Sequence, residues 1–520
     1  MTAATGAATG PGSDAGTGPD TEAGAATGRP PARWLVLAVV CLVQLAVVLD
    51  NTVLGVAVPS LTRDLGAGTA DLQWIVNAYS LVQAGLLLAA GSAADRYGRR
   101  RLMLLGLAVF GLGSLAAGLS HTTGRLIAAR AVMGVGGALL LTTTLAVVLQ
   151  VFDGPERTRA IGVWSAVSAL GYAAGPPIGG LLLAHFAWGS LFLVNLPVVL
   201  LGLLAGRALV PESRSPRGGP PDLTGVLLST VGVTAVVGAI VSGPEHGWSS
   251  AQVLGPAAAG LLALTAFVRW ELRCPHPMLD LGFFRDRRFV GAVTGVVLIT
   301  FGSTGVLFLL TQQLQFVRGY EPLEAGLRMA PFALTVVALN FTGLAARVTA
   351  RLGTPRSIAA GMAILAAGFA VAALAGGGYG PLLVGLLLMG TGCALANPAI
   401  VAAVLDAIPP ERAGAGAGVD GTMAEVGGSL GVAVLGAVLN ARFAALLPAG
   451  AAAGSLPAAL ATAGTDGERS AVLDAFAAAS RSGQLAGAGA VLAGGLTAAA
   501  LLRRADRRAE RQARAPSGTA

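Results

Sequence analysis

The segment "LAVVLDNTVLGVAVP", residues 45–59, places a single carboxylate inside an apolar run. That run extends from Trp34 to Leu61, and Asp50 is its only charged residue. About 20 apolar residues, each rising 1.5 Å along a helix, are enough to cross the hydrocarbon core of a bilayer. The run is therefore predicted to be a transmembrane helix with an acid buried in it.

Similar apolar blocks recur along the whole chain. Of its 520 residues only 12% are charged, whereas soluble proteins carry about 25%. The mean hydropathy is +0.73. Because unpaired backbone groups are costly in lipid, each block is predicted to be a helix. The sequence therefore indicates an all-α, polytopic membrane protein with fourteen spans: 34–61, 72–94, 102–119, 124–150, 160–184, 190–210, 223–243, 251–268, 289–311, 325–346, 357–376, 380–404, 414–440 and 484–502. Residues 441–483 are predicted to be an outer loop.

The composition excludes several classes of protein. All 34 basic residues are arginine, so neither a P-loop lysine nor Schiff-base chemistry is available. Cys41, Cys274 and Cys393 lie in two spans and one loop, which gives no disulfide framework. The four scattered histidines suggest no metal site. With no cluster of nucleophile, base or metal ligands, we expect neither an enzyme nor a bound cofactor.

The arginines are unevenly distributed between the two sides of the predicted membrane. If the N-terminus is inside, the cytoplasmic segments carry 26 arginines and the outer segments six. The positive-inside rule then places both termini in the cytoplasm of a plasma-membrane protein. The basic tail "RRADRRAERQARA", residues 503–515, is interpreted as an anchor on anionic lipid rather than as a nucleic-acid arm.

Two basic turns resemble each other across the chain. "GSAADRYGRRR", residues 91–101, aligns with "ARVTARLGTPR", residues 346–356, although a chance likeness in a chain rich in Arg and Gly is an alternative. Internal repeats of this kind are typical of secondary transporters, whose substrate site lies between the halves. The predicted organisation is a disordered N-terminus (1–33), two six-helix halves (34–210 and 289–502), a linker with two inserted helices (211–288) and the basic tail (503–520).

Several motifs occur in the order of a known family. "GSAADRYGRRR" resembles the loop motif of the major facilitator superfamily, and "RAVMGVGGA", residues 130–138, resembles its fourth-span motif. "GYAAGPPIGG", residues 171–180, resembles the fifth-span motif of its antiporters. "LDNTVLGVAVP", residues 49–59, resembles the first span of its fourteen-span drug:proton antiporters, the EmrB/QacA branch.

The resemblance implies roles for particular residues. Asp95 is expected to contact the N-terminus of span thirteen and to lock one conformation. The conformational loop motif comprises Gly91, Asp95, Arg96, Gly98, Arg99 and Arg101, and the antiporter helix motif comprises Gly171, Gly175, Pro176, Gly179 and Gly180. The glycines at four-residue spacing are also consistent with a plain helix-packing face, and the proline is expected to kink the helix.

The chain also departs from the family pattern. Met133 replaces the usual glutamine of the fourth-span motif, and "WGSLFLVNLP", residues 188–197, lacks the arginine and second tryptophan common there. "VPESR", residues 210–214, faintly resembles a sugar-transporter motif and is set aside as noise.

Asp50 and Arg130 are predicted to lie at the same depth. Asp50 is ten residues from Ser60, or roughly 15 Å, and Arg130 is nine residues from His121, or roughly 13 Å. Charges in the bilayer interior are costly and usually functional. One interpretation is a structural ion pair between spans one and four. The favoured one is proton coupling, in which the Asp50 carboxylate alternates between protonated and paired states.

Further polar residues are candidates for binding substrate or cations. Glu425 lies nearer the middle of span thirteen than Asp420, and five residues turn a helix by about 140°, so the two acids are not expected to face one cavity. A structural, hydrogen-bonded acid is the alternative for Glu425. Asn77 and Tyr79 are expected to line the outer cavity, with an interfacial anchor as the alternative.

The sequence thus predicts a monomeric, proton-coupled antiporter that exports hydrophobic compounds, cations among them, by alternating access. Its partners would be lipophilic small molecules, protons and the lipid bilayer, with no nucleic acid and no cofactor beyond the proton motive force. The alternative is a dedicated exporter of one endogenous metabolite such as an antibiotic.

Overall fold

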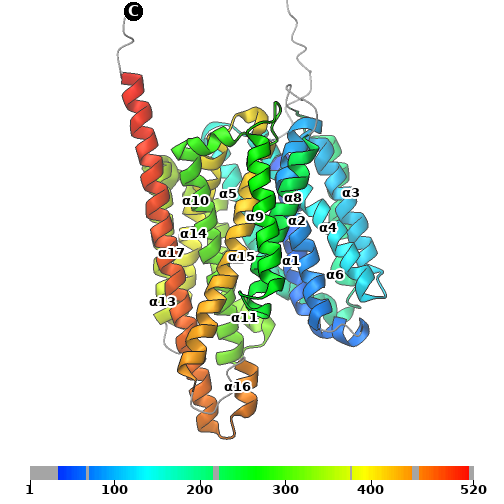
Figure 1. Cartoon of the computed structure of the whole chain (residues 1–520), viewed down its shortest axis with the longest axis vertical. Coiled ribbons are helices and arrows are strands. Elements are labelled where there is room, and N and C mark those ends of the chain that lie inside the picture. The colour runs from blue at the N-terminus through cyan, green and yellow to red at the C-terminus, as the bar shows by residue number, and fades with distance from the viewer. Residues whose placement is uncertain (1–32, 66–68, 215–221, 375–377, 448–455, 515–520) are drawn as a thin grey trace, which may run out of the picture.

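The structure is a computed structural model that describes residues 33–65, 69–214, 222–374, 378–447 and 456–514. This part of the chain is a bundle of α-helices without a β-strand (Figure 1). The helices are α1 (Arg33–Leu65), α2 (Thr69–Tyr97), α3 (Arg99–Gly118), α4 (Thr123–Val151), α5 (Gly154–His185), α6 (Ser190–Leu193), α7 (Asn195–Leu209), α8 (Leu223–His246), α9 (Ala251–Glu271), α10 (Arg287–Gln312), α11 (Pro322–Phe341), α12 (Leu344–Leu352), α13 (Thr354–Leu374), α14 (Tyr379–Asp406), α15 (Ala413–Leu446), α16 (Leu456–Thr462) and α17 (Asp466–Arg514). Short 3-10 turns, η1 (Leu281–Arg285) and η3 (Pro410–Arg412), precede α10 and α15, and a π-helical turn, η2 (Gln313–Val317), follows α10.

Each of the fourteen predicted spans coincides with helix over most of its described residues, and residues 375–376 of the eleventh lie outside the described residues. α6 and α7 are separated by Val194 alone and together form the sixth. α11 and α12 are bent by 68° at Gly343, whose φ of +70° suits a glycine. Among the described residues, twelve helices are long and apolar enough to cross a membrane, or thirteen if the bent pair is one span. The chain is therefore a polytopic membrane protein, and fourteen spans fit the structure without being settled by it.

Two large hydrophobic clusters hold the bundle together. One is built mainly from α1–α7 and the other mainly from α10–α17. The first also takes in residues from the adjoining ends of α14 and α15, namely Val401, Leu405, Ala413 and Ala417. The inserted pair lies at the side of the bundle: α8 contacts α2 and α15, α9 packs on α8, and Phe267 of α9 joins the second cluster. Figure 1 shows α8 and α9 on the near side of the bundle.

The two ends of the bundle differ. At one end residues 91–101 turn from α2 into α3, and we call this the motif end. At the opposite end α15, α16 and α17 project beyond the other helices (Figure 1). Of the predicted terminal segments, Arg33 begins α1 and residues 503–514 continue α17, whereas 1–32 and 515–520 lie outside the described residues.

The prediction of an outer loop over 441–483 is wrong for most of that segment. α15 continues to Leu446, α16 covers Leu456–Thr462, and α17 begins at Asp466. A capping box starts α17: the Thr465 hydroxyl accepts from Glu468 N (3.2 Å), while Glu468 Oε2 accepts from Thr465 N (3.2 Å). The signal "TDGE" at 465–468 was therefore present in the sequence, but the hydropathy pattern does not report helices that extend beyond the membrane.

Candidate functional site

Asp50 and Arg130 form an ion pair between α1 and α4. Arg130 Nη1 donates to Asp50 Oδ2, and both side chains are only 1% exposed. Arg130 Nε also donates to the carbonyl oxygen of Ile75 on α2 (3.2 Å). The pair therefore ties three helices together, and almost none of either side chain is accessible from the surface.

A second donor to the acid comes from the junction of α6 and α7. Asn195 Nδ2 lies 3.1 Å from Asp50 Oδ1 and 3.4 Å from Ser114 Oγ on α3. Asn195 is only 3% exposed. Both carboxylate oxygens of Asp50 thus have a donor, one charged and one neutral. Sequence reasoning missed Asn195 and Ser114, although an amide inside an apolar block was a usable signal.

Tyr79 contributes to this cluster instead of lining an open cavity. Its side chain is fully buried, and Arg130 Cζ lies 4.4 Å from the centroid of its ring, a cation–π contact. Gln83 Nε2 donates to the Tyr79 hydroxyl (3.1 Å). In this structure the expectation that Tyr79 faces the outer cavity is therefore not met, because the ring packs under the guanidinium. Asn77, two residues earlier, is partly exposed.

Glycines of the fourth-span motif allow this close packing. A Cβ on Gly134 would lie 2.6 Å from the carbonyl oxygen of Tyr79, and one on Gly137 would lie 2.6 Å from the Tyr79 hydroxyl. Any larger residue would push α4 away from α2. The same helix that carries Arg130 thus has the small face needed to set it against Tyr79.

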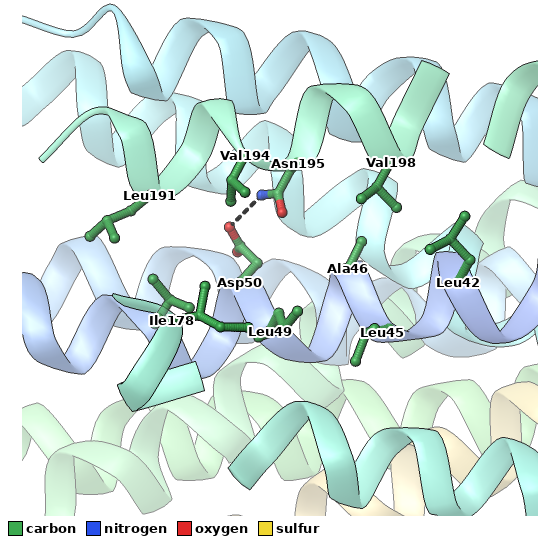
Figure 2. Close-up of a pocket in the computed structure, with 11 residues that line it drawn as sticks. Leu42, Leu45, Ala46, Leu49, Asp50, Ile178, Leu191, Val194, Asn195 and Val198 are labelled. Atoms are coloured by element: carbon green, nitrogen blue, oxygen red, sulfur yellow. Dashed lines mark hydrogen bonds between the residues drawn. The ribbon is translucent and has the colours of Figure 1, made fainter. Parts of the chain in front are cut away.

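A small pocket of about 90 Å³ lies beside Asp50, between α1, the later part of α5, and α6 with α7 (Figure 2). Asp50 and Asn195 are the only polar residues among those that line it. Its walls are apolar: Leu42, Leu45, Ala46, Leu49, Val53, Ile178, Leu191, Val194 and Val198. The carboxylate therefore borders a space with apolar walls rather than a polar channel.

At the motif end, Asp95 makes the contact with span thirteen that the resemblance implies. Its Oδ1 accepts from Gly414 N (2.7 Å) and its Oδ2 accepts from Ala415 N (2.8 Å), in the first turn of α15. Arg99 Nη2 donates to Asp95 Oδ1 as well (2.9 Å). Gly91 permits the approach, because a Cβ there would lie 2.2 Å from the Gly414 carbonyl oxygen. A carboxylate on helix N–H groups is favourable because the N-terminus carries partial positive charge.

Glu212, the acid of "VPESR", contacts the rest of the loop motif. Glu212 Oε1 accepts from Arg100 N (3.2 Å), and Oε2 lies 3.7 Å from Arg101 Nε. Gly98 turns the chain with φ +110°, and a Cβ there would meet Glu212 Oε1 at 2.6 Å. The segment "VPESR" thus has a structural role that was not predicted from the sequence. Glu212, which follows α7, holds the turn between α2 and α3.

Arg96 and a second ion pair complete the motif end. The Arg96 guanidinium carbon lies 5.2 Å from the centroid of the Tyr97 ring. Arg157 at the start of α5 lies 3.3 Å from Asp406 at the end of α14, which links the two groups of helices again. This pair is more exposed than Asp95, with 24% and 65% of the two side chains accessible.

The two acids of α15 have different surroundings. Asp420 is only 8% exposed, and its Oδ1 is buried without a hydrogen-bond partner among the described residues. Glu425 is partly exposed. A buried carboxylate oxygen without a hydrogen-bond partner is energetically costly, and this distinguishes Asp420 from Glu425.

The antiporter helix motif packs mainly on α1. A Cβ on Gly171 would lie 2.8 Å from Val48 Cγ1, and one on Gly175 would lie 2.0 Å from Thr52 Oγ1. Gly179 is buried, whereas a Cβ on Gly180 would meet nothing within 4 Å. Pro176 lies inside the continuous helix α5, and its side chain is outside the described set. The packing interpretation thus holds for Gly171 and Gly175.

Comparison with known proteins places these features in a family. The family model described as Major Facilitator Superfamily matches residues 40–432. The chain is 38% identical over 401 residues to the multidrug resistance protein Stp of Mycobacterium tuberculosis, covering 77% of this chain and 74% of that protein. It is 34% identical over 434 residues to the tetracenomycin C resistance and export protein of Streptomyces glaucescens, covering 83% and 80%. The crystal structure of the human organic anion transporter MFSD10 has a similar fold, with a TM-score of 0.63 at 17% identity over 90% of this chain and 100% of that one.

Proposed function

Because the chain belongs to the Major Facilitator Superfamily, we propose that it is a drug exporter that exchanges hydrophobic compounds, cations among them, for protons by alternating access. It would act as a monomer in the plasma membrane with both termini in the cytoplasm. The single observation that carries the proposal is the buried ion pair of Asp50 and Arg130. Relatives that include a multidrug resistance protein support it.

The ion pair offers a way to couple a proton to a conformation. As a carboxylate, Asp50 is compensated by Arg130 and Asn195. A proton on Asp50 would remove the negative charge beside the guanidinium, which would stay buried against the Ile75 carbonyl oxygen and the rings of Tyr79 and Phe192. Breaking a buried pair from one side costs about 3–5 kcal/mol. Protonation would therefore favour any conformation in which Arg130 gains water or another partner.

Contacts at the motif end would control the alternation between the two conformations of the transporter. The Asp95 carboxylate joins α2 to α15, and Arg157 joins α5 to Asp406 of α14. Both contacts must break before the two groups of helices can separate at that end. We therefore assign the present structure to the conformation closed at the motif end, which the arginine asymmetry places in the cytoplasm.

The substrate would bind between the two halves, as in other secondary transporters. Apolar walls accept lipophilic molecules without strict geometry. Glu425 and Asp420 are the acids proposed to bias binding towards cations, with Asn77 as a neutral contact. Coulomb attraction to such an acid is stronger in a low-dielectric cavity than in water.

The proposal is tested by efflux of a panel of fluorescent dyes from membrane vesicles, with and without an imposed pH gradient. We expect gradient-driven efflux by the wild type and none by Asp50→Asn, because the amide keeps the shape of the acid but cannot bind and release a proton. Asp64→Asn is the matched control, since Asp64 lies on the same helix with 46% of its side chain exposed. Undiminished gradient-driven efflux by Asp50→Asn would refute proton coupling through this residue.

A second candidate is a dedicated exporter of one antibiotic-like metabolite. The similarity to a tetracenomycin C resistance and export protein favours it. The same dye panel separates the two functions. Transport of several chemically unrelated dyes supports the multidrug function, whereas transport of none of them, together with gradient-driven export of tetracenomycin C, supports the dedicated one.

A further inference from the structure

A groove of about 610 Å³ lies beside the last turns of α9, at the motif end. Leu228 of α8 forms one wall, and the remaining lining residues belong to α9 and the segment after it: Leu262, Thr265, Ala266, Arg269, Trp270, Arg273, Cys274 and Pro275. α9 is poorly covered by protein, because only 17% of its most apolar stretch is buried. The groove therefore opens towards the surroundings of the bundle and not towards the Asp50 site.

Two arginines in this groove have no acidic partner among the described residues. Arg269 lies in the last turn of α9 and Arg273 in the turn that follows the helix; both are exposed, and both line the groove. Several other arginines of the motif end, though not all of them, are paired within the protein: Arg99 with Asp95, Arg100 with Glu212, Arg157 with Asp406, and Arg412 with Asp280. The positive charge of the groove is thus left for something outside the chain.

Two acids next to α9 and within it, Asp222 and Glu271, are engaged elsewhere. Asp222 Oδ1 accepts from Gly225 N and from Trp270 Nε1, each at 2.8 Å. Glu271 is only 4% exposed, and its Oε2 accepts from Leu279 N (3.3 Å). The other oxygens, Asp222 Oδ2 and Glu271 Oε1, are buried. Neither carboxylate is therefore available to compensate the groove.

We propose that this groove binds one anionic phospholipid, with the phosphate on Arg269 and Arg273. Arginine pairs suit phosphate because the guanidinium donates in a planar fork. Leu262 lies seven residues before Arg269, or roughly 10 Å deeper, so an acyl chain can run along Leu228, Leu262 and Ala266. Trp270, held by Asp222, stands at the level where membrane tryptophans concentrate.

Under the positive-inside rule the motif end faces the cytoplasm. Juxtamembrane arginines on that side meet the anionic lipids of the cytoplasmic leaflet. The occupant is a lipid and not a free anion, since the apolar walls continue below the charges. The proposal does not rest on proton coupling or on drug export. A transport-dead variant such as Asp50→Asn is expected to keep the lipid.

The test is native mass spectrometry of the purified full-length protein in detergent, titrated with dioleoylphosphatidylglycerol or with dioleoylphosphatidylcholine. We expect one phosphatidylglycerol to bind in preference to phosphatidylcholine. In the double variant Arg269→Gln with Arg273→Gln, its affinity is expected to fall roughly 30-fold. The matched control is Arg285→Gln with Arg287→Gln, two exposed arginines at the same end that do not line the groove. Its affinity is expected to be unchanged.

A second variant keeps the test decisive if the double variant does not fold. Ala266→Trp fills the apolar part of the groove without changing its charge, and it is expected to expel the lipid as well. Equal losses in the groove and control pairs, or equal binding of the two lipids, would overturn the proposal. So would displacement of the lipid by inorganic phosphate at the same concentration, because the site would then recognise a free anion.

Discussion

Replacing Asp95 by Asn is expected to open the motif end. The carboxylate accepts two amide N–H groups from the first turn of α15, at 2.7 and 2.8 Å, in addition to the Arg99 guanidinium. The asparagine side chain has one acceptor oxygen in place of two, and it carries no charge. One of the two α15 amides therefore loses its partner, and the other exchanges a charged acceptor for a neutral one.

The size of the effect follows from which contacts depend on conformation. Arg99 is four residues from Asp95 and moves with it, so this ion pair is present in both conformations. Its energy therefore cancels from the free-energy difference between the open and the closed conformation. The two α15 amides contact Asp95 only in the closed one. Leaving a buried donor unsatisfied costs about 1–3 kcal/mol, and a charged acceptor is worth about 1 kcal/mol more than a neutral one. We expect a net shift of about 2–4 kcal/mol, or roughly 30- to 900-fold in the ratio of open to closed.

The assay is a pulsed electron paramagnetic resonance distance measurement in a background without Cys41, Cys274 and Cys393. Spin labels at Arg101 and Arg356, both exposed at the motif end on opposite halves, report its opening. The longer-distance population is expected to rise in Asp95→Asn.

Asp406→Asn is the control for this experiment. It breaks the exposed pair with Arg157, which is worth at most about 1 kcal/mol, or roughly fivefold. If Asp406→Asn opens the motif end as far as Asp95→Asn does, or if Asp95→Asn leaves the distances unchanged, the assignment of the lock to Asp95 is wrong.

Three further outcomes are expected. Asn195→Leu removes the hydrogen bond to Asp50 Oδ1, which is worth about 1.5–3 kcal/mol for a charged acceptor. The initial rates of gradient-driven dye efflux should therefore fall at least tenfold. Unchanged rates would exclude a role for the amide. Glu425→Gln should weaken the export of cationic dyes more than that of neutral ones in the same vesicles, with divalent cations affected most; equal losses would leave Glu425 a coupling or structural acid. A reporter fused after the last residue should be active in the cytoplasm and one inserted near residue 452 outside, and an external C-terminus would show that the spans were miscounted.

Hydropathy alone determined where the membrane-spanning helices lie. Whether a segment crosses a membrane depends on its own length and polarity, because the lipid rather than the rest of the protein supplies the environment. The depths of Asp50 and Arg130 could be read from residue counts for the same reason, and the structure brings the two into contact. The contact of Asp95 with α15 was predicted from the resemblance to the family motif. No local pattern in the sequence indicates such a tertiary contact.

Only the tertiary structure decided what surrounds these charges. Asn195 is 145 residues from Asp50, and Glu212 is 112 residues from Arg100, so no local period links the partners. Tyr79 was expected at an open cavity but lies under Arg130, since Gly134 and Gly137 let α4 approach α2 closely. Such contacts depend on how near two helices come and how each is rotated about its axis. Those quantities are set by side-chain packing between the helices, and they leave no trace in the hydropathy of either one.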